Sequence, residues 1–231
     1  MKYYDGSKWS KVNGTDSSES NLEYEFVDLG LPSGLKWATC NLGATKPEEY
    51  GLYYAWGETG GRTIDDKEIT WADYKFSIDG SSEEFSKYNL TDNKVVLDFI
   101  DDAAHHVNDS MRIPTSEEYK ELIANVNKKW ETINGIAGVR LTSKTNGNSI
   151  FIPEHTLWSS SRYPSQPAYA YDVEINAYQM IAQNYYKFRT KVCVIRPVQE
   201  PSVPFNPNKY YTKAEIDAKL DAVLEQINSA E

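Results

Sequence analysis

The residue types that could carry out catalysis are few and poorly grouped in this 231-residue chain. Ser159, Ser160 and Ser161 follow Trp158, with His155 close before them, and serine with histidine is the pairing of an activated nucleophile. However, these serines lack the glycine-flanked turn of a nucleophile elbow, and no carboxylate that would orient the histidine can be identified. The chain also contains no GxSxG, HExxH, P-loop or paired-cysteine motif. The sequence therefore predicts a protein that is not an enzyme and that uses no cofactor.

Acidic side chains and histidines gather in two places, and neither place predicts a metal site. Residues 60–93 are rich in Asp, Glu, Ser and Gly and resemble a long insertion, but their acidic residues lack the ligand spacing and fixed glycine of a calcium loop. His105 and His106 are adjacent on a predicted helix, where they point about 100° apart. We therefore expect a solvated acidic face and no metal. The acidic residues are Asp65, Asp66, Asp73, Asp79, Glu83 and Glu84.

The cysteines also argue against zinc and against a disulfide-rich scaffold. Cys40 and Cys193 lie far apart and form no CxxC motif. They could pair if the first and last strands of the domain are neighbours. Two buried free thiols are the expected state.

The composition limits the partners of the chain. With 24 basic and 34 acidic residues the formal net charge is -10, and no basic run is long enough to follow a phosphate backbone, so nucleic acid is not expected as a partner. No segment approaches 18 consecutive apolar residues, and the opening residues lack the apolar core of a signal peptide. We expect neither membrane insertion nor export. The unusual feature is 17 Tyr and 6 Trp, which could form a binding face or pack a sheet-rich core.

Three apolar runs, residues 149–152, 168–175 and 192–198, predict short strands of a small antiparallel sheet that supports polar loops. In the middle run Ala168, Ala170, Asp172 and Glu174 alternate with Tyr169, Tyr171, Val173 and Ile175, as in a strand with one wet face. The residues between these runs are rich in Tyr, Ser and Gln. This layout suits recognition better than chemistry.

Two helices are predicted before this region. Residues 97–107 place Leu97, Ile100, Ala104 and Val107 on one apolar stripe. The second helix begins with Thr115 as N-cap and Glu118 at the third helical position, a capping box. Its predicted apolar face consists of Tyr119, Leu122, Ile123 and Val126.

The ends of the chain predict appendages to a domain at residues 22–199. Residues 1–21 read as a hairpin, with Asp5-Gly6 as a type I′ turn signal, followed by a linker. Residues 200–208 form a proline-punctuated connector, and residues 209–231 predict an amphipathic coiled-coil or docking helix that opens with a capping box. Such a short helix should need partners, although it could also pack back on its own domain. Its seam consists of Ile216, Leu220, Val223 and Ile227.

Six ordered motifs resemble the Fibrobacter succinogenes major paralogous domain family, which is similar in fold to C-type lectins. They are EYEFVDLGLPSGLKWATCNLGA (23–44), PEEYGLYYAWGET (47–59), SMRIPTSEEYKELI (110–123), LTSKTNGNSIFIP (141–153), LWSSS (157–161) and VIRPV (194–198). The resemblance implies an α+β fold, a C-type lectin-like domain of small twisted antiparallel sheets with two helices. The Glu-Pro-Asn and Trp-Asn-Asp motifs of calcium-dependent lectins are missing, so it does not imply that type of sugar binding.

Some members of this fold group are variable proteins whose diversified residues lie near the C-terminal end of the domain. The residues at matching positions are the expected ligand-facing set, although any one of them could be an ordinary solvated loop residue. They are Arg162, Tyr163, Ser165, Gln166, Tyr169, Tyr178, Gln179, Gln183, Asn184, Tyr185, Tyr186 and Lys187.

The segment YYTKAEIDAKL resembles segments of phage fibre and virion-attachment proteins, where it commonly accompanies trimers. Together the resemblances imply a phage head or tail fibre protein, made in the host cytoplasm, that forms a homo-oligomer, is located in the virion and attaches to a host-surface glycan or protein. The alternatives are a structural virion decoration or connector protein, which would bind other virion proteins, and a bacterial surface adhesin.

Overall fold

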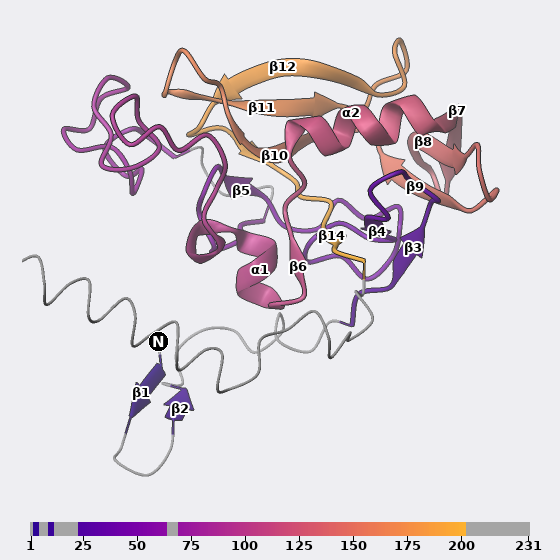
Figure 1. Cartoon of the computed structure of the whole chain (residues 1–231), viewed down its shortest axis with the longest axis horizontal. Helices are drawn as coiled ribbons and strands as arrows, with labels where there is room; N and C mark the ends of the chain where they lie inside the picture. Colours follow the sequence, from indigo (N-terminus) through magenta and orange to yellow (C-terminus); the bar gives the residue numbers. More distant parts are fainter. Residues whose placement is uncertain (1, 5–8, 12–22, 64–68, 202–231) are drawn as a thin grey trace, which may run out of the picture. The chain divides into compact units, whose positions relative to one another are not determined.

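The computed structural model describes residues 2–4, 9–11, 23–63 and 69–201 (Figure 1). The first strands are β1 (Lys2–Tyr4), β2 (Trp9–Lys11), β3 (Phe26–Asp28), β4 (Lys36–Ala38) and β5 (Tyr54–Ala55). The middle of the chain forms the 3₁₀ helix η2 (Phe99–Asp101), α1 (Ala103–Val107), β6 (Met111–Arg112), α2 (Ser116–Asn125), β7 (Val126–Ile133), β8 (Ile136–Ser143) and β9 (Ser149–Pro153). The last strands are β10 (Thr156–Arg162), β11 (Tyr169–Glu174), β12 (Ala182–Phe188), β13 (Val192–Cys193) and β14 (Val198–Gln199). In the described part of the chain, no helix is both long and apolar enough to span a membrane.

The architecture is α+β, with several small antiparallel sheets and few helices. The sheet orders are β3-β4-β14-β6, β7-β8-β9, β10-β11-β12, β13-β5 and β1-β2. The chain divides after Pro201. Residues 202–208 of the predicted connector and the predicted helix at 209–231, with the seam Ile216, Leu220, Val223 and Ile227, lie outside the described residues.

The sheet β3-β4-β14-β6 joins the two ends of the domain. Trp37 in β4 is fully buried and lies opposite Val198 in β14. The expectation of one strand over residues 192–198 was wrong, because β13 pairs with β5 whereas β14 pairs with β4 and β6. Between them the buried Arg196 side chain donates to Asn41 Oδ1 and to the carbonyl oxygens of Ala38 and Phe151. The chain leaves one sheet there and enters another.

The sheet β7-β8-β9 contains a hairpin that the sequence interpretation did not include. Val126, which we expected on the face of the second helix, begins β7. Asn134 and Gly135 connect β7 to β8, with φ angles of 49° and 85°, and two successive positive φ angles are the mark of a type I′ turn. The strand expected at residues 149–152 is confirmed as β9.

Helix α2 begins as predicted. The Thr115 hydroxyl accepts from Glu118 N–H at 3.2 Å, and the Glu118 carboxylate accepts from Thr115 N–H at 2.7 Å, which confirms the capping box. Tyr119 and Leu122 are fully buried. The helix packs along β10, β11 and β12, which Figure 1 shows beside it, and so it supports the sheet that carries the candidate site.

The expectation of one apolar-striped helix over residues 97–107 was wrong. Asp102 interrupts it, because its buried carboxylate accepts from the N–H groups of Ala104, His105 and Ile113 and so acts as the N-cap of α1. The preceding turn is the 3₁₀ helix η2, on which Ile100 is 76% exposed. The predicted stripe is therefore divided between the core and the surface.

The described part of the 60–93 region contributes aromatic side chains to the core. Tyr74, Phe76, Phe85 and Tyr88 are buried, whereas the acidic Asp73, Asp79, Glu83 and Glu84 lie at the surface as expected. Asp65 and Asp66 lie outside the described residues. The region is therefore packed against the domain by its aromatic residues while its acidic residues stay in water.

Arg189, immediately after β12, is fully buried among these aromatic rings. Its guanidinium carbon lies 4.0 Å from the centre of Phe85, 5.4 Å from Trp56 and 5.5 Å from Tyr74. Burial lowers the pKa of Arg189 to about 10. A cation stacked on aromatic faces replaces part of the lost hydration, so this side chain joins the insertion to the end of β12.

The predicted N-terminal hairpin is confirmed by the antiparallel pairing of β1 and β2. Tyr4 lies opposite Trp9, so residues 5–8, which include the predicted Asp5-Gly6 turn, connect the strands and lie outside the described residues. The linker expected at residues 13–21 lies outside them as well.

Candidate ligand-binding surface

The sheet β10-β11-β12 brings most of the predicted ligand-facing residues to two faces. Tyr169 lies opposite Phe188, and Tyr171 lies opposite Tyr186. Directly opposed residues of an antiparallel pair project to the same face, so these four side chains share one face. The alternate residues Ala170, Asp172, Tyr185 and Lys187 project to the other face.

Six side chains form a continuous row on the first face, which we call the aromatic strip: Trp71, Tyr163, Tyr169, Tyr171, Tyr186 and Phe188. Two pairs are stacked, Tyr163 on Tyr186 with ring centres 4.3 Å apart and Tyr169 on Phe188 at 4.4 Å. Edge-to-face contacts connect the pairs, with Tyr169 against Tyr186 at 5.3 Å and Trp71 against Phe188 at 5.7 Å. Each contact is worth about 0.5–1.5 kcal/mol beyond area burial, so the rings hold one another in place.

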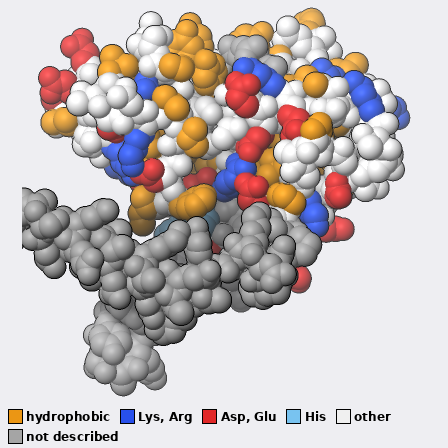
Figure 2. Space-filling model, viewed as in Figure 1, with side chains coloured by type: hydrophobic (Ala, Val, Ile, Leu, Met, Phe, Trp, Pro, Cys, Tyr) orange, Lys and Arg blue, Asp and Glu red, His pale blue; other side chains and the backbone are white. Residues whose placement is uncertain are grey.

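The aromatic strip is open to solvent. Tyr186 is 45% exposed and Phe188 is 37% exposed, and the other four rings are half-buried. Figure 2 shows hydrophobic side chains gathered on the side of the molecule where Figure 1 places β11 and β12. Within the described part of the chain, no hydrogen bond occupies the hydroxyl groups of Tyr163, Tyr169, Tyr171 and Tyr186. The strip therefore offers rigid apolar area together with polar groups that can bond to a ligand.

The opposite face of the same sheet is charged. Lys187 Nζ donates to Glu174 Oε1 at 2.7 Å and lies 3.5 Å from Asp172 Oδ2. The Asp172 side chain is fully buried, and among the described residues neither of its oxygens has a hydrogen-bond partner. Burial raises the pKa of Asp172 to about 6, and the attraction of Lys187 offsets only part of that effect. The pKa of Lys187 is raised, because its bond to Glu174 and the charge of Asp172 outweigh its own burial.

A structured turn connects β11 to β12. The Asn176 side-chain oxygen accepts from the N–H groups of Tyr178 and Gln179, at 3.0 Å and 2.9 Å. The turn leaves Tyr178 97% exposed. Gln179 Oε1 accepts from the hydroxyl of Tyr185 at 3.2 Å, which places both residues with the turn and away from the aromatic strip.

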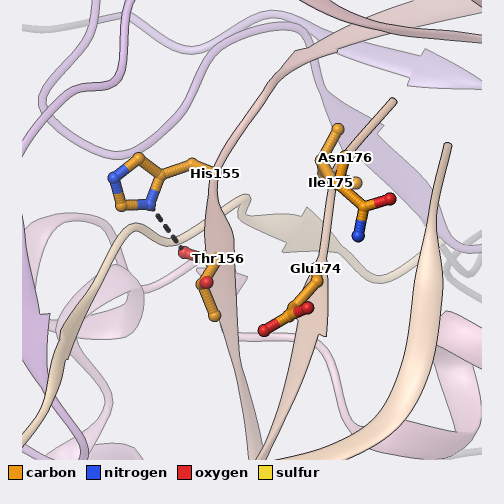
Figure 3. Close-up of a pocket in the computed structure, with 5 residues that line it drawn as sticks. All are labelled: His155, Thr156, Glu174, Ile175 and Asn176. Carbon is orange, nitrogen blue, oxygen red and sulfur yellow. Dashed lines mark hydrogen bonds between the residues drawn. The ribbon is translucent and has the colours of Figure 1, made fainter. Parts of the chain in front are cut away.

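A shallow hollow of about 260 Å³ lies beside this turn (Figure 3). His155, Thr156, Glu174, Ile175 and Asn176 line it. Figure 3 shows the imidazole of His155 turned away from Glu174, and its Nδ1 lies 3.2 Å from the carbonyl oxygen of Thr156. Burial lowers the pKa of His155. The hollow therefore does not combine its histidine and its carboxylate into an acid–base pair.

The structure divides the predicted ligand-facing residues into groups. Tyr163, Tyr169 and Tyr186 lie on the aromatic strip, and Ser165 and Gln166 are exposed in the loop between β10 and β11. The others are Tyr178 and Gln179 in the turn, Tyr185 and Lys187 on the charged face, and Gln183 and Asn184, whose side chains lie outside the described residues.

Arg162 does not face a ligand. It is 2% exposed, and its guanidinium donates to the carbonyl oxygens of Lys94, Tyr163 and Pro164. Its position at the end of β10 turns the side chain inward, where it satisfies the backbone of two loops. Arg162 therefore supports the surface from beneath.

Three strip residues were missing from the predicted set: Trp71, Tyr171 and Phe188. The alternation of Tyr169 and Tyr171 along one strand indicates that the two share a face, so Tyr171 could have been included. Phe188 and Trp71 reach the strip through strand register and through the fold of the insertion, which no local pattern reveals.

The serines and cysteines that the sequence analysis considered for catalysis or metal binding are buried. Ser159, Ser160 and Ser161 lie in the core, and the Ser159 hydroxyl donates to the carbonyl oxygen of Tyr171. Cys40 and Cys193 are buried free thiols, as expected, and Cys193 lies in β13, which pairs with β5. Among the described residues, no group of three or more His, Cys, Asp or Glu side chains is arranged to hold a metal ion.

The fold and the surface together define an α+β domain that presents an aromatic face on a small antiparallel sheet. Comparisons with protein-family models, with curated proteins and with solved structures found no match to this chain.

Proposed function

We propose that this chain is a non-enzymatic phage virion fibre protein, of the head or the tail, whose domain attaches to the surface of the host. The aromatic strip is the observation that carries the proposal. Aromatic residues supply large contact area at little loss of conformational entropy, and clusters of them dominate the energy of recognition surfaces. The mutual stacking of Tyr163 with Tyr186 and of Tyr169 with Phe188 fixes the rings before any ligand arrives. A ligand would therefore bind without having to order them.

The finer fold assignment belongs to the same proposal. The domain is a C-type lectin-like domain of the Fibrobacter succinogenes major paralogous domain family, and its six ordered motifs support this. Several motif residues have structural roles that a family would retain, such as the buried Trp37, the capping pair of Thr115 with Glu118 and the buried Arg196. In the sequence, the predicted ligand-facing residues lie between the capping pair and Arg196.

The quaternary part of the proposal rests on the sequence of residues 209–231. A seam of apolar residues at spacings of four, three and four favours association of helices, and we propose a trimer. Several copies of one weak surface on a single fibre would raise its avidity for a cell surface. The seam is Ile216, Leu220, Val223 and Ile227.

The test compares two variants of the full chain in binding to a panel of intact bacterial cells. Tyr163→Ser with Tyr186→Ser removes a stacked pair from the aromatic strip, and loss of most cell binding is expected. Ile78→Ser is the control, because Ile78 is 64% exposed, lies off the strip and is not among the predicted ligand-facing residues, so this variant should bind like the wild type. Thermal unfolding of each variant shows whether the fold is retained. Full binding by a folded strip variant, or no binding to any cell by the wild type, would refute the attachment role.

One observation favours the structural virion protein as a second candidate. Five apolar side chains of the 90–100 segment are exposed, and apolar residues gathered in this way commonly contact another protein. This role predicts that the purified chain binds capsid or tail proteins. Phe99→Ser should abolish that binding, and the Tyr163→Ser, Tyr186→Ser variant should retain it. The residues are Leu90 (58%), Val95 (42%), Val96 (41%), Phe99 (59%) and Ile100 (76%).

A further inference from the structure

Strand β12 forms an open edge of the sheet that carries the aromatic strip. The order of this sheet is β10-β11-β12, so among the described strands β12 has a neighbour on one side only. The opposite edge is covered, since Ser161 and Leu157 in β10 form bridges with Val96 and Val194. Figure 1 shows no other described strand beside β12. An edge strand of seven residues thus borders an exposed aromatic face.

The main-chain groups that point outward along this edge can be identified from the register. The N–H of Arg189 donates to the carbonyl oxygen of Ala168 at 2.9 Å, so these two residues form a hydrogen-bonded pair. Hydrogen-bonded and non-hydrogen-bonded pairs alternate along antiparallel strands. Phe188 and Tyr186 are therefore in non-hydrogen-bonded pairs with Tyr169 and Tyr171, and their N–H and C=O groups point away from β11.

Most of these outward groups have no partner within the described part of the chain. The Phe188 carbonyl accepts from Lys191 N–H at 2.9 Å, in the turn that ends β12. The N–H and C=O of Tyr186 and the N–H of Phe188 are not used by any described residue. Such a row of donors and acceptors, spaced along an extended strand, matches the main chain of another extended peptide.

In the part of the chain that the structure describes, the edge also lacks the features by which proteins usually block strand addition. Those features are prolines, charges placed along the edge and covering segments. From Tyr185 to Phe188, the only charged side chain is Lys187, which lies on the opposite face and bonds to Glu174. Tyr186 and Phe188 instead place two exposed rings beside the free main-chain groups.

We propose that an extended, uncharged segment of a partner protein adds to β12 as a fourth strand of this sheet. Its main chain bonds to Tyr186 and Phe188, and its alternate side chains lie over the aromatic strip. This inference rests on the proposed function and specifies its ligand as protein. The strip favours apolar side chains because it carries no ionised group. A polysaccharide lacks the regular N–H and C=O spacing that the edge matches, and stacking between the strip rings leaves it less free ring area.

The first experiment compares two substitutions at one position in the full chain. Tyr186→Pro and Tyr186→Val both remove the ring, but only the proline also removes the outward N–H. Proline is tolerated on strand edges, and this N–H makes no bond to β11, so the fold should survive, which circular dichroism and thermal unfolding would check. We expect Tyr186→Pro to bind cells at least about tenfold more weakly than Tyr186→Val. Equal binding by the two folded variants would overturn strand addition.

The second experiment uses the wild-type chain and therefore does not depend on the folding of a variant. The probe is the capped peptide Ser-Thr-Val-Thr-Val-Thr-Val-Ser, and its twin carries N-methyl groups on alternate residues so that one edge cannot donate hydrogen bonds. Titration calorimetry should show binding of the peptide and at least about tenfold weaker binding of the twin. Equal affinity for both, or binding of neither at millimolar peptide, would overturn strand addition. Retained cell binding in that case would leave the attachment role standing, so the two proposals can fail separately.

Discussion

Replacement of Asp172 by Asn should stabilise the domain at neutral pH. The Asp172 side chain is fully buried, has no hydrogen-bond partner among the described residues and lies 3.5 Å from Lys187. Burial raises its pKa from 3.8 to about 6, a shift of about 2 units. At about 1.4 kcal/mol per unit, the folded state prefers the protonated carboxyl by about 3 kcal/mol. This preference already includes the attraction of Lys187, and the amide of Asn removes the ionisation altogether.

The sign of the pH dependence follows from the raised pKa. The protonated Asp172 carboxyl contributes its full stability below pH 3.8, where it is protonated in both the folded and the unfolded state. This contribution is lost as the pH rises through about 6, where the carboxyl ionises in the folded state. Relative to the wild type, Asp172→Asn should therefore gain about 3 kcal/mol in free energy of unfolding at pH 7 but only about 1 kcal/mol at pH 4.5. Comparing the two proteins at each pH cancels the titration of all other groups.

Urea unfolding at pH 4.5, 6 and 7, followed by tryptophan fluorescence, measures these differences. Glu174→Gln is the matched control, because it removes the other carboxylate near Lys187 from a half-buried position. It should change stability by less than about 1 kcal/mol at pH 7. If Asp172→Asn destabilises the domain at pH 7, or its effect does not depend on pH, then the pairing with Lys187 outweighs burial and the reasoning is refuted.

Substitutions at three further positions test the scaffold by chemical denaturation at pH 7. Arg189→Met should change stability by less than about 1.5 kcal/mol, because Arg189 Nε and Nη2 are buried and have no hydrogen-bond partner among the described residues, whereas Arg189→Ala should cost about 3 kcal/mol through the cavity it leaves. Thr115→Ala should cost about 1 kcal/mol by removing the N-cap of α2, and Thr115→Ser should restore most of it. Ile100→Ser should have an effect within about 0.5 kcal/mol, since Ile100 is 76% exposed, and a loss above 2 kcal/mol would mean that this side chain is buried after all.

The parts of the fold that the sequence predicted depend on short-range interactions. The capping box of α2 involves two residues three positions apart, and strands β9 and β11 are set by local runs of apolar or alternating residues. The hairpin of β7 and β8 has an equally local signal in Asn134-Gly135, which a search for two-residue turns would have found. The sequence therefore contained the information needed to predict this hairpin, and the interpretation missed it.

Other errors arose from contacts that no local pattern contains. Asp102 ends the predicted stripe because its carboxylate also accepts from Ile113, eleven residues further along. Arg196 interrupts the last predicted strand because it satisfies Asn41 and Phe151, which are distant in sequence. In each case a buried polar group required partners from other segments, and its requirement outweighed the local periodicity.

The candidate surface was predicted in composition but not in geometry. A tyrosine-rich region around β10, β11 and β12 follows from the sequence, yet neighbours along one strand point to opposite faces. Tyr185 and Tyr186 are adjacent in sequence, but the first bonds to Gln179 beside the turn and the second stacks on Tyr163. Only the register with β11 decides which of them belongs to the strip.

The same register explains why one sheet can be both rigid and open. Asp172, Glu174 and Lys187 form charged contacts on one face, while the rings on the other face stack on one another. Because Lys187 is held by carboxylates of β11, the edge strand is fastened to its neighbour through side chains as well as through backbone bonds. The outward N–H and C=O of Tyr186 bond to no described residue, so a further strand could bond to them without breaking a hydrogen bond within the described part of the domain.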